Sequence, residues 1–325
     1  MQRSWKSLAL TVSVMTAVAG CASGTGPSDE GVSRIAVTTS ILGSVVEQIV
    51  ACVGDDTWQV DVLMPRGTDP HDFSPSSDQV ARAVSAEVVV ANGLGLEENL
   101  HEVLDQIEAD GGVVWEVAEW ANPLPFAYSA ENHAEEPHDE EGDGSHGHGD
   151  EDPHFWLDAS RMAMVASEFG ARMAVDHGPV WAECGDDLSH DLNALDAEVA
   201  EILDSIPASQ RVLITEHESF GYFAEHYGFS LGGAVIPGGG TLAQANVQDV
   251  QALVEVLRAQ EVRAVFGSVS RGASPLLETL AEESGNEVDV VLLYVESLGE
   301  PGGEAGSYQD MMLTNARALS DALRG

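Results

Sequence analysis

Short apolar runs alternate with amphipathic segments along the first half of the chain. Strand-like runs are expected at 34–39, 60–64, 88–91 and from 113 onward. Segments with helical spacing of apolar residues separate them, at 41–50, 78–85 and 96–107. Strands that alternate with helices in this way predict a parallel sheet with helices on both of its faces.

The second half repeats this alternation after one long helix. Helices are predicted at 161–175 and 181–206, and the longer one carries Leu188, Leu192, Leu195, Val199 and Ile202 at steps of four and three. Strands at 211–215, 231–236, 262–266 and 288–294 then alternate with helices at 221–227, 246–258, 275–284 and 308–323. We therefore expect an α/β fold with an N-terminal lobe at 33–180 and a C-terminal lobe at 208–325, joined by a linking helix at 181–207.

The first twenty residues have the features of a signal peptide. Arg3 and Lys6 form a positive segment, and the apolar run that follows is too short to span a bilayer. Val18-Ala19-Gly20-Cys21 has the small-residue pattern of a bacterial lipoprotein cleavage site. We expect a lipid on Cys21 and a flexible tether at 21–32, which anchor the chain to the outer face of the cytoplasmic membrane. An ordinary signal peptide with a chance cysteine is the alternative.

Two further cysteines, Cys52 and Cys184, remain in the mature chain. An even pair in an oxidising compartment suggests a disulfide between them, whereas two free buried thiols are the alternative. The chain has no C-x-x-C spacing, so a thiolate metal site is not indicated.

The charge of the chain is strongly negative. The formal net charge is −42, from 55 acidic and 13 basic residues. Such a surface repels nucleic acid and anionic lipid headgroups, so we expect no nucleic-acid partner. It attracts cations without choosing among them, and the charge alone therefore identifies no site.

Three histidines stand in distinctive phrases at the ends of apolar runs. His71 ends G-T-D-P-H, His154 lies within D-P-H-F-W-L-D, and His217 lies within T-E-H-E-S-F-G-Y-F. Any one of them alone would be interpreted as an ordinary core or surface histidine. Three histidines on loops at strand ends can converge on one metal ion.

A fourth histidine-rich segment lies at 130–151 and consists almost entirely of Glu, Asp, His, Gly and Pro. It has too little apolar surface to order itself, so a mobile loop is expected. Its histidines are candidates for weak accessory metal binding, with a solvated insertion of no effect as the alternative: His133, His138, His146 and His148.

These phrases, together with Y-Q-D-M-M at 308–312, resemble those of the metal-specific solute-binding proteins of ABC transporters, the cluster A-I family. The resemblance implies that His71, His154 and His217 are metal ligands in a cleft between the lobes. The fourth family ligand is usually an Asp after the last strand, and Glu296 stands at that position here. The resemblance also implies an ABC permease with its cytoplasmic ATPase as partner, and we expect a monomer.

This donor set favours zinc as the captured and transported ion. Three neutral imidazoles and a carboxylate suit a tetrahedral Zn²⁺, whereas manganese prefers more oxygen donors. In manganese-type relatives the third position is commonly Glu, and here it is His217. Manganese remains the alternative cargo. Because protons compete for imidazoles of ordinary pKa, zinc affinity is expected to weaken below about pH 6.

The residues next to these ligands could influence the site without binding the ion. Glu216, Glu218 and Asp72 flank ligands, and either orient the imidazoles or are simply solvated. Phe266-Gly267-Ser268-Val269-Ser270 departs from the relatives, which tend to carry an acidic or amide residue there. We expect this departure to alter the wall of the C-terminal lobe without contacting the four ligands.

Two other classes of function stay open at this point. A zinc enzyme keeps an open metal position for water and a general base nearby, but four protein ligands leave none and no H-E-x-x-H is present. A zinc buffer or adhesin without a transporter would use the same ligands, and the sequence does not separate it from a transport protein.

Overall fold

The computed structural model describes residues 32–127, 151–236, 240–241, 247–285 and 287–324. The signal peptide, Cys21, the tether up to residue 31 and the four histidines of the segment at 130–151 lie outside the described residues. Within the described ranges, no helix combines the length and the apolar character that crossing a membrane requires. The residues from 33 onward form one compact unit.

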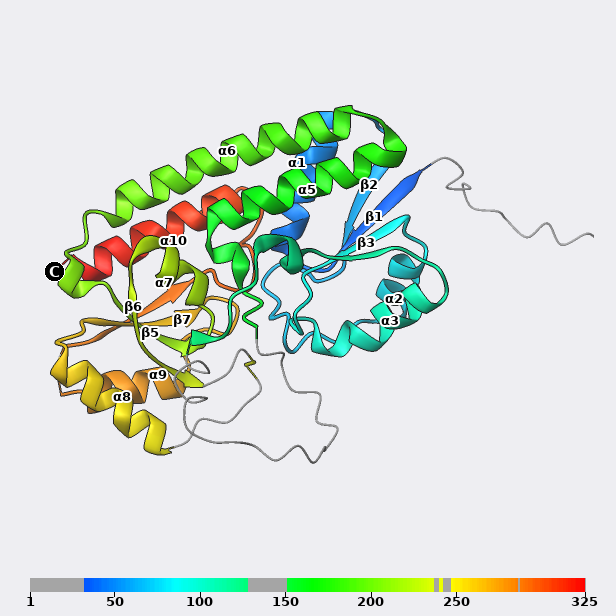
Figure 1. Cartoon of the computed structure of the whole chain (residues 1–325). Coiled ribbons are helices and arrows are strands. Elements are labelled where there is room, and N and C mark those ends of the chain that lie inside the picture. Colours follow the sequence, from blue (N-terminus) through cyan, green and yellow to red (C-terminus); the bar gives the residue numbers. More distant parts are fainter. Residues whose placement is uncertain (1–31, 128–150, 237–239, 242–246, 286, 325) are drawn as a thin grey trace, which may run out of the picture. The chain divides into compact units, whose positions relative to one another are not determined.

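The N-terminal lobe contains a four-stranded parallel sheet. Its strands are β1 (Ser33–Val37), β2 (Trp58–Val62), β3 (Val88–Ala91) and β4 (Val114–Glu116), in the order β2-β1-β3-β4. Its helices are α1 (Ser40–Val53), α2 (Ser77–Val84) and α3 (His101–Ala109), with α2 and α3 away from α1 (Figure 1). The inner strand β3 is continuously apolar and fully buried, as expected where helices cover both faces of a sheet, whereas the edge strand β2 carries the polar residues Gln59 and Asp61.

The C-terminal lobe repeats the same arrangement. Its strands are β5 (Val212–His217), β6 (Ser230–Ile236), β7 (Ala264–Ser268) and β8 (Asp289–Leu293), in the parallel order β6-β5-β7-β8. Its helices are α7 (Gly221–Tyr227), α8 (Val247–Ala259), α9 (Pro275–Glu283) and α10 (Tyr308–Leu323). In both lobes the strand order reverses beside the first strand, and ligands of open α/β sheets bind outside the carboxyl ends of strands at such a point.

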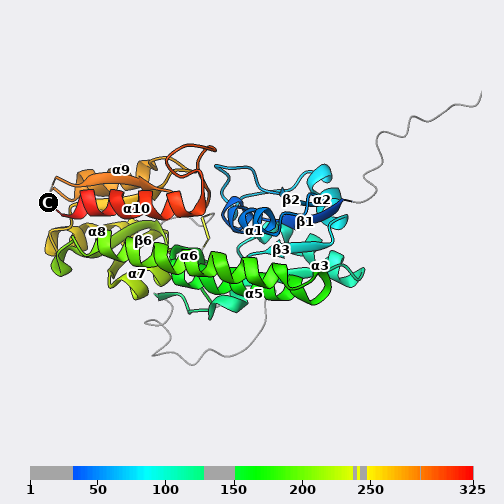
Figure 2. The ribbon, with the colours of Figure 1, turned by 90° about the horizontal axis from the view of Figure 1, so that it is seen from above.

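Two long helices follow the N-terminal sheet, α5 (Ala159–His177) and α6 (Val180–Leu203). Helix α6 packs against α5 and α1 in one lobe and against α10 in the other, as both views show (Figures 1 and 2). It does so with the predicted apolar stripe, since Leu188, Leu192, Leu195 and Val199 are buried. The structure thus confirms two α/β lobes linked by a long helix.

Cys52 and Cys184 form a disulfide in the structure, with their Cα atoms 5.8 Å apart and a separation of 132 positions in the sequence. Cys52 lies in the last turn of α1 and not after it, because that helix continues to Val53 before Gly54 ends it in the left-handed conformation. Cys184 lies near the start of α6. The bridge therefore fastens the linking helix to the N-terminal lobe.

The element boundaries mostly fall within a few residues of the predicted ones. One exception is the helix predicted at 96–107. A short 3-10 helix (Glu98–Leu100) precedes α3, because the buried carboxylate of Glu97 accepts the backbone N–H groups of Asn92 and Gly93 and holds this loop. Three more short 3-10 helices complete the described fold, at Val117–Ala121, Phe155–Leu157 and Ala208–Gln210.

Hydrogen bonds join the two lobes directly. Arg66 after β2 donates from Nη1 to the carbonyl oxygens of Gly299 and Gly306, at 2.7 and 2.9 Å. The Trp156 Nε1–H donates to the carbonyl oxygen of Val295 at 2.7 Å. Both contacts hold the segment after β8, which carries Glu296, against the N-terminal lobe.

Candidate metal centre

The three histidines of the distinctive phrases meet at one place. One ring nitrogen from each of His71, His154 and His217 lies within 4.8 Å of the others. His71 and His154 are fully buried, and His217 is 2 % exposed. Glu296 is buried beside them, with its Oε1 3.5 Å from His217 Nε2. The structure therefore brings the three predicted histidines together, with Glu296 beside His217.

Each lobe contributes two of these four side chains. His71 lies in a turn after β2, and Glu296 follows β8. His217 is the last residue of β5 itself, because the strand extends two residues beyond its predicted end. His154 departs from the expectation of a loop after a strand: it precedes the 3-10 helix Phe155–Leu157, as its N-cap residue. Its place depends on that helix and on the segment leading to α5.

The sequence Asp-Pro-His occurs twice and forms the same kind of turn each time. The Oδ1 atom of Asp69 accepts the backbone N–H of His71 at 3.0 Å, and Oδ1 of Asp152 accepts that of His154 at 2.9 Å. An Asp that bonds the backbone two residues ahead closes an Asx turn, and the proline between them restricts the chain further. The repetition was a sequence signal for these two supporting carboxylates that the sequence analysis missed.

Asp152 also determines which nitrogen His154 can offer to an ion. Its Oδ1 lies 2.7 Å from His154 Nδ1, so a neutral imidazole donates the Nδ1 proton there and keeps its lone pair on Nε2. Nε2 is the atom that faces His71, 3.3 Å from Nε2 of that ring. Gly221 permits this packing, because a Cβ at that position would lie 2.5 Å from Asp152 Oδ2.

Two hydroxyl groups hold the carboxylate of Glu296. The Ser268 and Ser270 hydroxyls both donate to Oε2, the latter at 2.9 Å. The expectation that this departure from the relatives would leave the ligands untouched was therefore wrong. Ser268 ends β7, which pairs with β8 in register, and this pairing brings it beside a residue 28 positions later in the chain.

Burial controls the protonation of the site. Loss of water is the main reason that the pKa of His217 lies well below its usual value, and the positive charge of Arg271 adds to the shift, so this imidazole is neutral. Burial also raises the pKa of Glu296 to about 7, and the negative charge of Asp69 adds to the shift. Within the described part of the chain, His217 Nε2 and Glu296 Oε1 make no hydrogen bond. A positive ion between them would compensate both buried atoms.

Two distances between candidate donor atoms agree with tetrahedral coordination. Zinc bonds of roughly 2.0–2.1 Å at tetrahedral angles separate two donors by about 3.3 Å, whereas right angles at the same bond length would bring them to about 2.9 Å. Nε2 of His71 and Nε2 of His154 lie 3.3 Å apart, and His217 Nε2 and Glu296 Oε1 lie 3.5 Å apart. The three imidazoles can hold a small divalent cation, and Oε1 of Glu296, beside His217, is the candidate for a fourth donor.

A charged contact joins the two lobes near the site. Arg271 of the C-terminal lobe donates from Nη1 to Oδ2 of Asp69 at 3.0 Å, and its Nε lies 3.8 Å from Glu216 Oε1. Thr241 donates to the same Asp69 oxygen at 2.8 Å. Glu216 thus has a charged neighbour from a loop that the sequence analysis did not single out. Asp72, by contrast, is exposed, which agrees with simple solvation.

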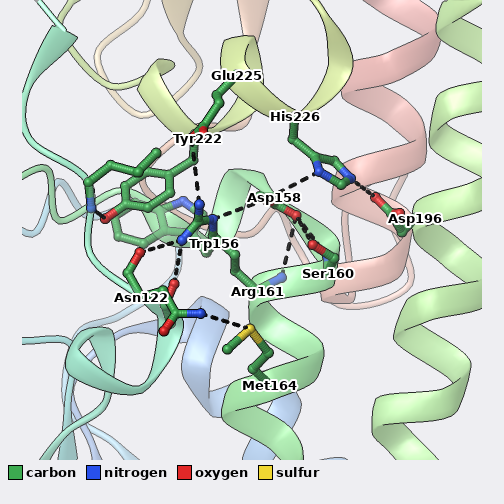
Figure 3. A network of polar contacts seen from close by, with 12 residues as sticks. Asn122, Trp156, Asp158, Ser160, Arg161, Met164, Asp196, Tyr222, Glu225 and His226 are labelled. Atoms are coloured by element: carbon green, nitrogen blue, oxygen red, sulfur yellow. Dashed lines mark hydrogen bonds and ion pairs between the residues drawn. The ribbon is translucent and has the colours of Figure 1, made fainter.

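A second cluster of titratable groups lies where α5, α6 and α7 meet (Figure 3). His226 Nε2 lies 2.8 Å from Asp196 Oδ1, and its Nδ1 lies 3.6 Å from Asp158 Oδ2. Asp158 already has protein partners: Oδ1 accepts the backbone N–H of Ser160 at the start of α5, and Oδ2 pairs with Arg161 Nε at 3.2 Å. Because Arg161 already supplies positive charge to Asp158, we interpret this cluster as structural support for α7, the helix that follows His217.

The comparisons with known proteins agree on one kind of protein. The family model described as "Zinc-uptake complex component A periplasmic" matches residues 35–322. The manganese-binding lipoprotein MntA of Bacillus subtilis is 28 % identical over 317 residues, which cover 95 % of each chain. The manganese ABC transporter substrate-binding lipoprotein PsaA of Streptococcus anginosus is 26 % identical over 99 % of each chain. The solved structure of the periplasmic zinc-binding protein TroA from Treponema pallidum has a TM-score of 0.73 at 23 % identity, over 91 % of this chain and all of that one.

Proposed function

The chain belongs to the family of the periplasmic component A of the zinc-uptake complex, and we propose that it captures Zn²⁺ outside the cytoplasm for an ABC importer. The family membership makes it a solute-binding protein and not an enzyme. The observation that supports the choice of cargo is the donor set: three imidazoles and one carboxylate, buried, with separations of 3.3 and 3.5 Å.

Manganese is the second candidate cargo, because relatives that match nearly the whole chain are named as manganese-binding lipoproteins. The donor set argues against it. Manganese prefers oxygen ligands and higher coordination numbers, whereas the four candidate ligands supply one carboxylate. The cargo is therefore best decided by direct competition between the two ions.

The experiment is a chelator competition on metal-free protein with Zn²⁺ and Mn²⁺ in parallel. We expect one tight zinc per chain and much weaker manganese binding. Replacing His154 by Ala should lower zinc affinity by more than the roughly 10–100-fold that loss of a supporting residue costs. His190→Ala is the matched control, since His190 is an exposed histidine of α6. Unchanged zinc affinity in His154→Ala would remove the basis of the proposal.

A third variant tests the identity of the ion more sharply. His217→Glu replaces the third imidazole by the residue type of manganese-type relatives at this position. The change should weaken zinc binding and improve manganese binding relative to it, because a second carboxylate replaces a nitrogen donor. A wild-type protein that already prefers manganese would favour the second candidate.

The partner in this proposal is an ABC permease with its cytoplasmic ATPase, and the chain acts as a monomer held to the outer face of the cytoplasmic membrane by a lipid on Cys21. The sequence pattern at 18–21 supports the anchor. A zinc buffer or adhesin would need no permease. Zinc uptake should be measured in cells that lack either this protein or the permease. Equal uptake defects support delivery of zinc to the permease, and normal uptake without this protein contradicts delivery.

A further inference from the structure

We infer that Ser268 and Ser270 determine the metal specificity of the proposed zinc site by restricting Glu296 to one ligand oxygen. Both hydroxyl groups donate to Oε2 of this carboxylate, while Oε1 is the oxygen 3.5 Å from His217 Nε2. The inference rests on the proposed function. It assigns a role to two residues outside the ligand set.

The two carboxylate oxygens of Glu296 differ in their hydrogen bonding. Oε2 has two hydroxyl donors, whereas Oε1 makes no hydrogen bond to any described residue. Glu296 is 1 % exposed, so water does not compensate a lost contact. If the carboxylate turned to offer both oxygens to an ion, both hydroxyls would lose Oε2 as their acceptor. Their oxygens lie 2.8 Å apart, so one hydroxyl could then donate to the other, but the second would be left without this partner. The pair of serines therefore favours an arrangement with a single donating oxygen.

The backbone places these serines rigidly. Ser268 ends β7 opposite Leu293 of β8, and the N–H of Val269 donates to the Leu293 carbonyl at 2.9 Å. Beyond the strand, the N–H groups of Arg271 and Gly272 both donate to the carbonyl oxygen of Ser268, which closes the turn that carries Ser270. The sheet register and this turn thus hold both hydroxyls at the carboxylate.

A one-oxygen carboxylate matters because it limits the number of ligands. Three imidazoles and one oxygen complete the four positions that zinc uses in closed sites. Manganese is better served by six oxygen-rich positions, and a carboxylate that binds through both oxygens would move the site toward that number. The serine pair should therefore act against manganese without itself touching the ion.

The test compares Ser268→Ala/Ser270→Ala with the wild type, using Zn²⁺, Mn²⁺ and Co²⁺ as the probes. Zinc-over-manganese preference should fall about 10-fold or more in the double variant, in the range typical of residues that support a ligand. Co²⁺ reports the geometry, because four-coordinate Co²⁺ absorbs visible light far more strongly than five- or six-coordinate Co²⁺. We expect intense bands in the wild type and weaker bands in the double variant.

Single variants separate hydrogen bonding from packing. Ser270→Ala should shift the preference in the same direction, and Ser270→Thr, which keeps a hydroxyl at a partly exposed position, should restore it. Unchanged preference and an unchanged Co²⁺ spectrum in the double variant would overturn the inference. If the wild type itself bound manganese better than zinc, the proposed cargo would be wrong, and the Co²⁺ comparison would still decide whether the serines restrict the carboxylate.

Discussion

Each imidazole of the candidate centre must keep one nitrogen lone pair for the ion, and the supporting carboxylates decide which nitrogen that is. For His154 the Asp152 carboxylate fixes the proton on Nδ1. Burial raises the pKa of Asp152 well above its usual value, although the backbone N–H of His154 opposes the shift. A positive ion on the other side of the ring would favour the charged form of this carboxylate again.

Replacing Asp152 by Asn should therefore weaken zinc binding without removing a ligand. An amide can present its NH₂ group to Nδ1 and so favour the wrong tautomer of His154. We expect a loss of about 10–100-fold in zinc affinity, measured by chelator competition. Asp72→Asn, at an exposed carboxylate next to His71, is the control and should bind as the wild type does. Equal affinities for the two variants would show that the Asp152 contact does not orient the ligand.

The pH dependence of binding should follow Glu296 before it follows the histidines. The raised pKa of about 7 means that this carboxyl holds a proton below that pH in the metal-free protein, and zinc must displace it. Zinc affinity should then decrease as the pH falls through about 7. The pKa of His217 is lowered, so protonation of this ligand sets in only at more acidic pH. Ordinary histidines alone predict a fall below about pH 6, and Glu296 adds to this a fall that begins at higher pH.

Calorimetry in buffers of different ionisation enthalpy measures this proton directly. The wild type should release a proton from Glu296 on binding zinc near neutral pH, and Glu296→Gln should lack that contribution. The variant will bind more weakly, but its affinity should depend less on pH between 6 and 8. The same proton release in both proteins would mean that another group titrates.

At the scale of elements, the carboxyl ends of β5, β7 and β8 bring His217, Ser268 and Glu296 to one edge of the C-terminal sheet. The alternation of apolar runs and amphipathic segments was enough to predict both sheets and the linking helix, because parallel strands and amphipathic helices have recognisable patterns of apolar residues. The three histidines were predictable from their phrases. Ser268 was not, because its contact depends on the register between β7 and β8, which no local pattern encodes. Arg271 was missed for the same kind of reason, since its partner Asp69 lies in the other lobe.

The disulfide between α1 and α6 should contribute strongly to stability. Closing a loop of this length lowers the conformational entropy of the unfolded chain, which stabilises the folded protein by about 4–5 kcal/mol. Any strain in the folded protein reduces this stabilisation. In a Cys21→Ser background, the further change Cys52→Ser/Cys184→Ser should lower the free energy of unfolding by up to that amount. Urea denaturation measures the difference. Two free thiols in the denatured, unreduced Cys21→Ser protein would show that the bridge does not form.

At the scale of the whole molecule, the site exists only while the lobes meet. His71 and His154 come from one lobe and His217 and Glu296 from the other, and Arg66 and Trp156 bind the segment after β8 across the boundary. An ion held by all four residues adds to these contacts, so zinc should stabilise the folded chain in a concentration-dependent way.

The segment at 130–151 is proposed to gather zinc without forming the tight site. The segment lies outside the described residues, and its composition predicts many weak histidine and carboxylate donors. Deleting 132–149 should therefore keep one tight zinc per chain and remove additional weak binding, which calorimetry can resolve. Zinc capture should slow only when zinc is scarce. Loss of the tight site in the deletion variant would contradict this division of roles.

The most direct test of the central claim is the position of the ion in crystals of the zinc-loaded protein, measured by anomalous scattering at the zinc absorption edge. We predict one strong peak at roughly 2.0–2.2 Å from a ring nitrogen of each of His71, His154 and His217 and from Oε1 of Glu296. A fully loaded protein with its principal peak elsewhere, or with one of these three histidines outside bonding distance, would contradict the account.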